Sequence, residues 1–472
     1  MLFNSAVFLF LFLPALLLLY YVIPKKLRNG LLFLSSLFFY TWGEQELVVI
    51  MLLSTIIDFS AGILIEQGKK KLGLILSLTF NLGLLAVFKY LDFFFENYNS
   101  LLSLLGVDSG YLLQLPGIAL PIGISFYTFQ TMSYTIDVYY GKVKANRNFI
   151  DFGAYVTMFP QLIAGPIVRY ADINEQLKSR EVSVSKFAEG VERFIIGLAK
   201  KMIFANTFGY IADGIFMHNP ADLTTGAAWL GIIAYSLQIY FDFSAYSDMA
   251  IGLGKMFGFD ILENFNYPYI ARSIKEFWRR WHISLSTWFR DYLYIPLGGN
   301  KKGTRRTYIN LFIVFFITGM WHGSSWNFII WGLFHGLFLV IERIGFDKIL
   351  EKTWRPVQHL YALLIALVGW VFFRAEDLSQ ALDYLLSMGG INKGILNAGV
   401  YLDAETILIF ILGFILAMPV YKPIRSHIEA YSKMNFGLIA LFVYYLFLGA
   451  LLFISIAIIS SDTYSPFIYF RF

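Results

Sequence analysis

The sequence contains no cysteine and little charge. The absence of cysteine excludes disulfide bonds, thiolate metal sites and a cysteine nucleophile. Only 15% of the 472 residues are charged, whereas 58% are hydrophobic, so the chain lacks the charged surface of a soluble domain of this length. The basic residues lie at the ends of apolar runs and not in a separate domain, which argues against nucleic-acid binding.

Apolar runs long enough to cross a hydrocarbon core of about 30 Å recur along the whole chain. They predict an all-α polytopic membrane protein that forms one membrane-embedded domain over residues 1–472. The first run, Leu2 to Ile23, has no basic region before it and is too long for the core of a signal peptide. We therefore predict a retained first helix with an outside N-terminus.

Basic clusters at residues 25–28, 69–71 and 142–147 are separated by neutral or acidic connections, which predicts that the clusters are cytoplasmic. The outer segment Gly106 to Pro121 contains glycine and proline and is predicted to re-enter the membrane as a broken helix. Ser185 to Lys201 alternates charged and apolar residues, which is typical of an amphipathic helix lying on the membrane surface.

Two apolar regions carry polar interruptions. Pro160 to Arg169 contains two prolines and a glycine, which predicts either irregular backbone covered by protein or a simple corner between helices. Asp242 and Asp248 are six residues apart and point about 120° away from each other on one helix. They therefore do not form a paired carboxylate site. We expect structural pairing with an arginine for each, with a helix cap or the lining of a polar cavity as alternatives.

Ser273 and Glu276 form a capping-box pattern, which predicts a helix from there through Tyr292. One side of this helix is basic and another is aromatic, the pattern of a helix lying in the lipid headgroup layer. The basic side carries Arg272, Lys275, Arg279 and Arg290. The aromatic side carries Trp278, Trp281, His282, Leu285, Trp288 and Tyr292.

The run Thr318 to Gly336 places His322 and His335 among apolar, small and aromatic residues. A helix climbing from the basic turn at Arg306 lifts His322 by up to about 24 Å, well inside the bilayer. An ionisable side chain at that depth is a candidate functional site, and a neutral imidazole suits general-base catalysis. The glycines Gly319 and Gly323 predict that the helix breaks beside His322.

The two histidines do not suggest a metal site. They lie about 20 Å and 220° apart on a continuous helix, and no Asp or Glu lies between them. We predict no metal and a structural role for His335, packed near Trp326 and Trp331. Besides His282, three more histidines are predicted to be polar residues at the membrane surface. They are His218, His359 and His427.

Several long motifs resemble the membrane-bound O-acyltransferase (MBOAT) family, and within it the bacterial branch that acetylates exported polysaccharides such as alginate. The similarity extends from Phe3 to the C-terminus. It is carried by residues 121–130, 159–169, 240–252, 263–269, 277–299 and the Trp-His-Gly motif at 321–323.

The resemblance implies a ring of roughly 11–13 transmembrane and re-entrant helices around a central tunnel, with interfacial helices and a family core at about residues 115–345. It also implies a multi-pass protein of the bacterial cell membrane. Its catalytic residues would be His322 and His282, the latter on the cytoplasmic approach. We predict that Arg279, Arg280, Trp321 and Asp242 bind substrate.

The activity implied is transfer of acetyl from a cytoplasmic thioester, with acetyl-CoA as donor and no tightly bound cofactor, to an exported or cell-surface polysaccharide. The implied partner is an exported SGNH-esterase-like acetyltransferase. The basic side of the 273–292 helix is expected to steer donor phosphates, although binding of anionic lipid predicts the same residues and is favoured for most of them. Alternative functions are D-alanyl transfer to teichoic acid and transport of a lipid-linked or acyl-carrying substrate.

Overall fold

The structure is a computed structural model that describes residues 1–107, 109–163, 165–420 and 437–461. This part of the chain is helical and contains no β-strand, only an isolated bridge between Leu223 and Leu396. Within it, six helical segments are long and apolar enough to cross a membrane, which agrees with the predicted multi-pass protein. They are Lys25–Glu66, Lys70–Phe88, Val184–Phe216, Trp326–Lys352, Arg355–Arg374 and Leu438–Ser461. The ring around a tunnel stays a prediction.

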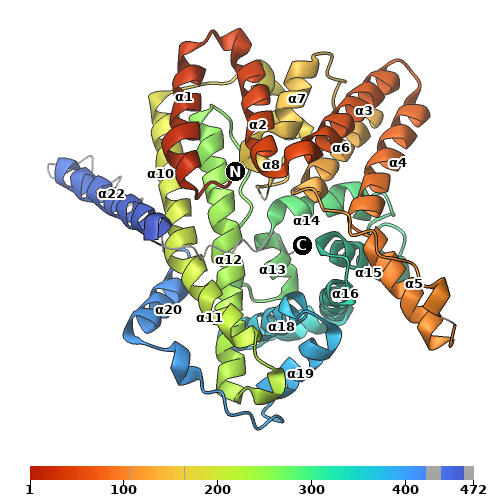
Figure 1. Cartoon of the computed structure of the whole chain (residues 1–472), viewed down its shortest axis with the longest axis vertical. Coiled ribbons are helices and arrows are strands. Elements are labelled where there is room, and N and C mark those ends of the chain that lie inside the picture. Colours follow the sequence, from red (N-terminus) through yellow and green to blue (C-terminus); the bar gives the residue numbers. More distant parts are fainter. Residues whose placement is uncertain (108, 164, 421–436, 462–472) are drawn as a thin grey trace.

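The N-terminal part of the chain forms one side of the molecule in Figure 1. Its helices are α1 (Leu13–Val22), α2 (Arg28–Glu44), α3 (Val48–Glu66), α4 (Lys70–Phe88), α5 (Leu91–Leu104), α6 (Ile124–Tyr139), α7 (Phe149–Thr157), α8 (Phe159–Leu162) and α9 (Tyr170–Lys178). The first apolar run is a helix, but its regular part, Phe8–Val22, is shorter than the six spanning segments.

The remaining helices follow in chain order from α10 to α22. They are α10 (Val184–Ala199), α11 (Asn206–Phe216), α12 (Thr225–Met256), α13 (Ile274–Arg280), α14 (Ile283–Phe289), α15 (Thr304–His322), α16 (Trp326–Ile341), α17 (Asp347–Lys352), α18 (Arg355–Arg374), α19 (Leu378–Met388), α20 (Ala404–Leu416) and α22 (Gly437–Ser461).

Helix α12 is the central element of the fold, and Figure 1 shows it between α10 and α11 on one side and α13 and α14 on the other. Its N-terminal half packs into one hydrophobic core with α13 to α16 and α18, and its C-terminal half packs into a second core with the N-terminal helices. Both of its carboxylates are in ion pairs, as expected, although Asp242 pairs with a lysine where an arginine was predicted. Asp242 forms a 2.7 Å ion pair with Lys201, and Asp248 lies 2.7 Å from Lys200.

The surface position predicted for Ser185 to Lys201 is wrong. Helix α10 packs along α12 and continues through a π-helical turn into α11. Its charged residues pair with charges of the neighbouring elements: Arg193 binds Asp248, and Glu189 binds Lys255 at 2.6 Å. The charged residues that suggested contact with lipid headgroups are therefore paired with other charged residues of the protein.

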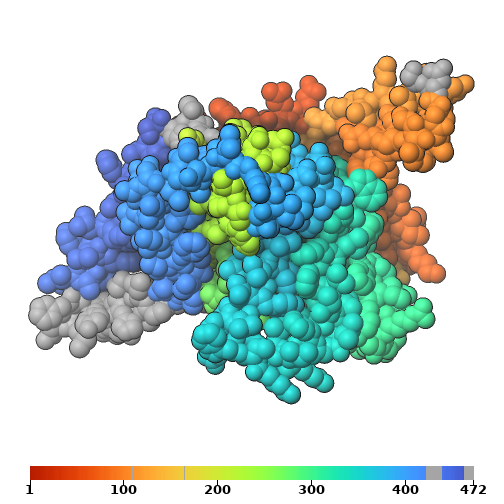
Figure 2. Space-filling view, turned by 90° about the horizontal axis from the view of Figure 1, so that it is seen from below, coloured from red at the N-terminus to blue at the C-terminus, as the bar shows by residue number. Residues whose placement is uncertain are grey.

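The re-entrant helix predicted for Gly106 to Pro121 is also wrong. Apart from the short 3₁₀ turn Ser109–Tyr111, the described part of this segment is non-helical and largely exposed. The side chain of Asn99 binds both the N–H and the carbonyl of Leu113 at 2.8 Å, which ties the segment back to α5. Figure 2 shows α5 and this segment standing out at one edge of the molecule, with α22 at the other.

For residues 160–169, irregular backbone covered by protein is the correct alternative. Helix α8 has only four residues, and the non-helical stretch that follows is buried. Its backbone groups bind protein partners: the Val168 carbonyl accepts from Tyr155 Oη at 3.1 Å, and the Ile167 N–H donates to Ser284 Oγ at 3.0 Å. The segment therefore packs directly against the region that contains His282.

Candidate active site

The predicted helix of residues 273–292 begins where the capping pattern places it. Ser273 Oγ accepts from the Glu276 N–H at 3.1 Å, and Glu276 Oε2 accepts from the Arg272 N–H at 2.9 Å. However, the single helix through Tyr292 is wrong, because α13 and α14 are separated by a turn at Trp281 and His282.

The break is made by Asn264, which supplies the hydrogen bonds that a continuous helix would have made. Its carbonyl accepts from the Ile283 N–H at 2.9 Å, and its side-chain Oδ1 accepts from the Ser284 N–H at 3.1 Å. His282 itself has a left-handed backbone with φ of 43°, which non-glycine residues rarely adopt. The strained turn orients the imidazole toward the protein interior.

The His282 ring is fully buried and held in one tautomer. Its Nδ1 lies 3.2 Å from Asn264 Oδ1, an acceptor that also receives the Ser284 N–H, so Nδ1 is the donor. Among the described residues, Nε2 has no hydrogen-bond partner. A neutral His282 therefore presents the lone pair of Nε2 to the interior.

The aromatic side of this region faces the protein core and not the headgroup layer. Trp278, Trp281 and Trp288 are buried, and Trp288 stacks on Phe129 with ring centroids 3.8 Å apart. Its indole N–H also donates to the Phe129 carbonyl at 2.9 Å. The interfacial position predicted for the aromatic side is therefore wrong, whereas the basic side is exposed.

His322 is the last residue of α15, and the chain turns at Gly323 as the glycines predict. Helices α15 and α16 approach closely at glycine, since a Cβ on Gly332 would lie 2.1 Å from the Phe315 carbonyl. The His322 ring, 5% exposed, contacts Trp331 with ring centroids 4.9 Å apart and Phe373 at 5.2 Å. Within the described chain, no group hydrogen-bonds its imidazole.

Trp321 joins the two histidines. Its indole contacts the His322 ring at 4.9 Å and the His282 ring at 6.1 Å between ring centroids, and its N–H donates to the Ser125 carbonyl at 3.3 Å. The sequence placed His282 near the cytoplasmic face and His322 deep in the membrane. The structure brings both imidazoles into contact with one tryptophan.

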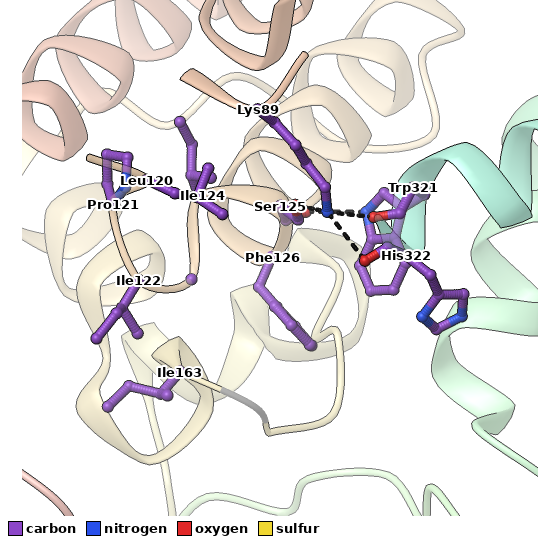
Figure 3. Close-up of a pocket in the computed structure, with 11 residues that line it drawn as sticks. Lys89, Leu120, Pro121, Ile122, Ile124, Ser125, Phe126, Ile163, Trp321 and His322 are labelled. Carbon is purple, nitrogen blue, oxygen red and sulfur yellow. Dashed lines mark hydrogen bonds between the residues drawn. The ribbon is translucent and has the colours of Figure 1, made fainter. Parts of the chain in front are cut away.

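A cavity of about 330 Å³ adjoins His322 and Trp321 (Figure 3). It is lined by Lys89, Ser125, Phe126, Ile163 and residues 120–124. Lys89 was not predicted, although it is the only charged residue between Leu72 and Leu91, and a lone charge in an apolar run is itself a signal.

A second pocket of about 440 Å³ lies along the preceding turns of α15, from Leu311 to Thr318. It is apolar at α15 and basic where Lys275, Arg279 and Arg290 line it. Among the described residues, no carboxylate lies within ion-pair distance of Arg279 or Lys275. The pocket thus suits an amphipathic anion.

Arg280, by contrast, is engaged in structural contacts. It pairs with Glu276 at 2.8 Å and donates to the Asn266 carbonyl at 3.0 Å. Burial alone would raise the pKa of Glu276, but the backbone N–H of Arg272 and the Arg280 guanidinium hold that pKa below its usual value. The two arginines predicted together therefore differ in their surroundings.

The other candidates are placed as follows. His335 is fully buried against Trp331, as predicted, whereas Trp326 instead donates to Asn97. His359 faces the Ala271 carbonyl at 3.2 Å. Asp242 lines neither pocket and is paired with Lys201. His427 lies outside the described residues.

Comparison with known proteins identifies the family. The model of the MBOAT, membrane-bound O-acyltransferase, family matches residues 140–373. A protein named probable alginate O-acetylase AlgI from Pseudomonas putida is 42% identical over 100% of both chains. The chain belongs to the membrane-bound O-acyltransferase family. It is accordingly an O-acyltransferase similar to AlgI-type O-acetylases.

Two further relatives cover most of the chain. A probable alginate O-acetylase AlgI from Azotobacter vinelandii is 48% identical over 81% of this chain and 76% of the relative. A peptidoglycan O-acetyltransferase from Helicobacter pylori is 38% identical over 83% of this chain and 80% of the relative. The region matched by the MBOAT model contains His282, Trp321 and His322.

Proposed function

We propose that this O-acyltransferase transfers acetyl from a cytoplasmic thioester, acetyl-CoA, across the bacterial cell membrane for O-acetylation of an exported or cell-surface polysaccharide. The observation that carries the proposal is the position of His282 and His322 on one indole, with a basic pocket on the preceding turns of α15 and a cavity beside its end. The names of the relatives support acetyl as the group and a polysaccharide as the acceptor.

His322 is the proposed general base. Its imidazole has no hydrogen-bond partner in the described chain, so it is available to take the proton of an acceptor hydroxyl. The hydroxyl oxygen then attacks the thioester carbonyl, a C–O bond forms, the C–S bond breaks, and the proton taken up by His322 passes to the leaving thiolate. General-base assistance of this kind contributes roughly 10²–10⁴-fold to the rate.

His282 is the proposed second histidine, which orients the donor or assists protonation of the leaving thiolate by taking up a proton at Nε2 and passing it on. Asn264 fixes its tautomer so that Nε2 faces the interior as an acceptor. Trp321, which contacts both rings, is proposed to line the path of the acyl group.

Donor binding is proposed at the basic pocket. Arg279, with no acidic partner in the described chain, is the residue we assign to the donor phosphates, since guanidinium binds phosphate in a bidentate fashion. Arg280 is proposed to support this site through its contacts with Glu276 and Asn266. Asp242 stays a predicted substrate-binding residue, although its ion pair with Lys201 already explains its burial. An exported SGNH-esterase-like protein is the proposed acceptor-side partner.

The decisive experiment measures transfer of labelled acetyl by the purified full-length protein, and the acetyl content of the cell-surface polymer by mass analysis. His322→Ala at unchanged protein level is expected to abolish both, whereas His335→Ala would act only through stability. Full acetylation in His322→Ala would refute the general base. A D-alanyl group on the polymer in place of acetyl would show that D-alanine is the group transferred. Movement of the substrate across the membrane with the thioester left intact would indicate a transporter.

A further inference from the structure

The C-terminal end of α15, which carries His322, is capped by Lys89 and Tyr90, the two residues that follow α4. Tyr90 Oη donates to the Met320 carbonyl at 2.7 Å. Lys89 Nζ donates to the Trp321 carbonyl at 2.5 Å and to the His322 carbonyl at 3.4 Å. The last carbonyls of a helix have no partner within it, so these contacts satisfy three successive acceptors.

The charge of Lys89 suits this position. A helix C-terminus carries partial negative charge, and a cation there is stabilising. Lys89 is buried, 8% exposed, and among the described residues no carboxylate lies within ion-pair distance of it. A buried ammonium is costly unless hydrogen bonds replace its hydration, and the end of α15 supplies them.

Lys89 is poorly placed to bind a ligand directly. Its third contact is Ser125 Oγ at 3.2 Å, so all three ammonium hydrogens have protein acceptors. Figure 3 shows the His322 carbonyl facing Lys89 and the imidazole pointing away from it. The lysine therefore contacts the backbone that carries the histidine and not its ring.

The same contacts hold Trp321. Ser125 accepts from Lys89 through its hydroxyl, and its carbonyl accepts from the Trp321 indole N–H at 3.3 Å. The start of α6, the end of α4 and the end of α15 are thus joined around one ammonium group. Both the backbone and the indole of Trp321 are fixed by this arrangement.

We propose that Lys89 and Tyr90 form a clamp that positions His322 and Trp321 for acyl transfer. This rests on the proposed function, which makes His322 the base. Both are positioning residues, because they act through the carbonyls of residues 320–322. The clamp holds the last turn of α15. At the end of that turn, the Gly323 N–H donates to the Gly319 carbonyl at 3.4 Å, and Gly323 makes no other backbone hydrogen bond among the described residues.

The test compares steady-state acetyl transfer by purified full-length variants over a range of acetyl-CoA concentrations. Lys89→Met is expected to lower kcat by about 100-fold with little change in the KM for donor, because displacement of a reacting group by about 1 Å costs that much. Tyr90→Phe removes one hydroxyl and is expected to lower kcat by about 5-fold. Lys89→Arg keeps a cationic donor and should recover part of the rate.

Lys70→Met is the matched control, since Lys70 is an exposed lysine at the other end of α4, and it should retain wild-type kcat. If Lys89→Met does not fold, Tyr90→Phe and Lys89→Arg decide the question. The clamp would be overturned if Tyr90→Phe keeps the wild-type kcat and Lys89→Met does so as well. It would also be overturned if Tyr90→Phe keeps the wild-type kcat while Lys89→Arg recovers none of the activity lost in Lys89→Met. A raised KM with unchanged kcat in Lys89→Met would also overturn it, in favour of donor binding.

The His322→Ala variant separates the two proposals. If it is inactive while Lys89→Met and Tyr90→Phe transfer acetyl normally, only the clamp fails. If it transfers acetyl normally, the proposed base fails and the clamp fails with it.

Discussion

Asn264 provides the sharpest test of how the site is held together, because one side-chain oxygen organises the break at His282. Its Oδ1 accepts from His282 Nδ1 at 3.2 Å, from the Ser284 N–H at 3.1 Å and from Ser284 Oγ at 2.9 Å. Asn264→Ala leaves the fully buried His282 Nδ1–H and the half-buried Ser284 N–H without this acceptor. At about 1–3 kcal/mol for each, the free energy of unfolding should fall by roughly 2–6 kcal/mol.

The same substitution should change catalysis more than donor binding. Without Oδ1, His282 Nδ1 keeps only the longer 3.5 Å contact with Ser284 Oγ among the described residues, so its tautomer is held less firmly. The kcat is therefore expected to fall by about 10-fold or more while the KM for acetyl-CoA stays near the wild-type value. The assays are denaturant unfolding in detergent and acetyl transfer by the purified protein. Asn266→Ala is the matched control, since the Asn266 side chain is exposed. Equal stability and kcat in both variants would refute the assigned role of Asn264.

Two further predictions concern charged residues near the site. Arg279→Gln should raise the KM for acetyl-CoA several-fold with kcat retained. Arg280→Gln should mainly lower the stability of the protein, because the ion pair with Glu276 is lost. A raised KM in Arg280→Gln and an unchanged KM in Arg279→Gln would contradict the assignment. Lys201→Met leaves the buried Asp242 carboxylate without its lysine partner and should destabilise the protein by about 3–5 kcal/mol. The double variant Lys201→Met/Asp242→Leu should recover much of this loss. An additive loss of stability in the double variant would show that the two residues are not coupled.

The sequence predicted those features of the site that depend on nearby residues. The start of α13 follows from Ser273 and Glu276, and the end of α15 follows from glycine at 323. The angle between Asp242 and Asp248 around the helix correctly predicted that they do not share a site. Each carboxylate forms its own ion pair, with Lys201 and Lys200 respectively. Motif resemblance gave the family, which the comparison over the full chain then established.

The features that the sequence did not predict depend on distant residues. The break at His282 is made by Asn264, 18 positions earlier, where capping and periodicity rules do not apply. The charged pattern of Ser185 to Lys201 has the same appearance whether it faces lipid headgroups or the charges of α12. The contacts of Lys89 with the end of α15 cross more than 230 positions, so only the lone charge in its apolar run marks it.

The two pockets adjoin successive turns of α15. Helix α15 lines the basic pocket as far as Thr318 and the other cavity from Trp321. Thr318 and Trp321 are separated by about 4.5 Å of rise along the helix axis. Under the proposed function, an acyl group moving from Arg279 to His322 has to pass this turn of α15, where both histidine rings contact the indole of Trp321. This makes the orientation of that ring, and the backbone contacts that hold it, part of the catalytic requirement.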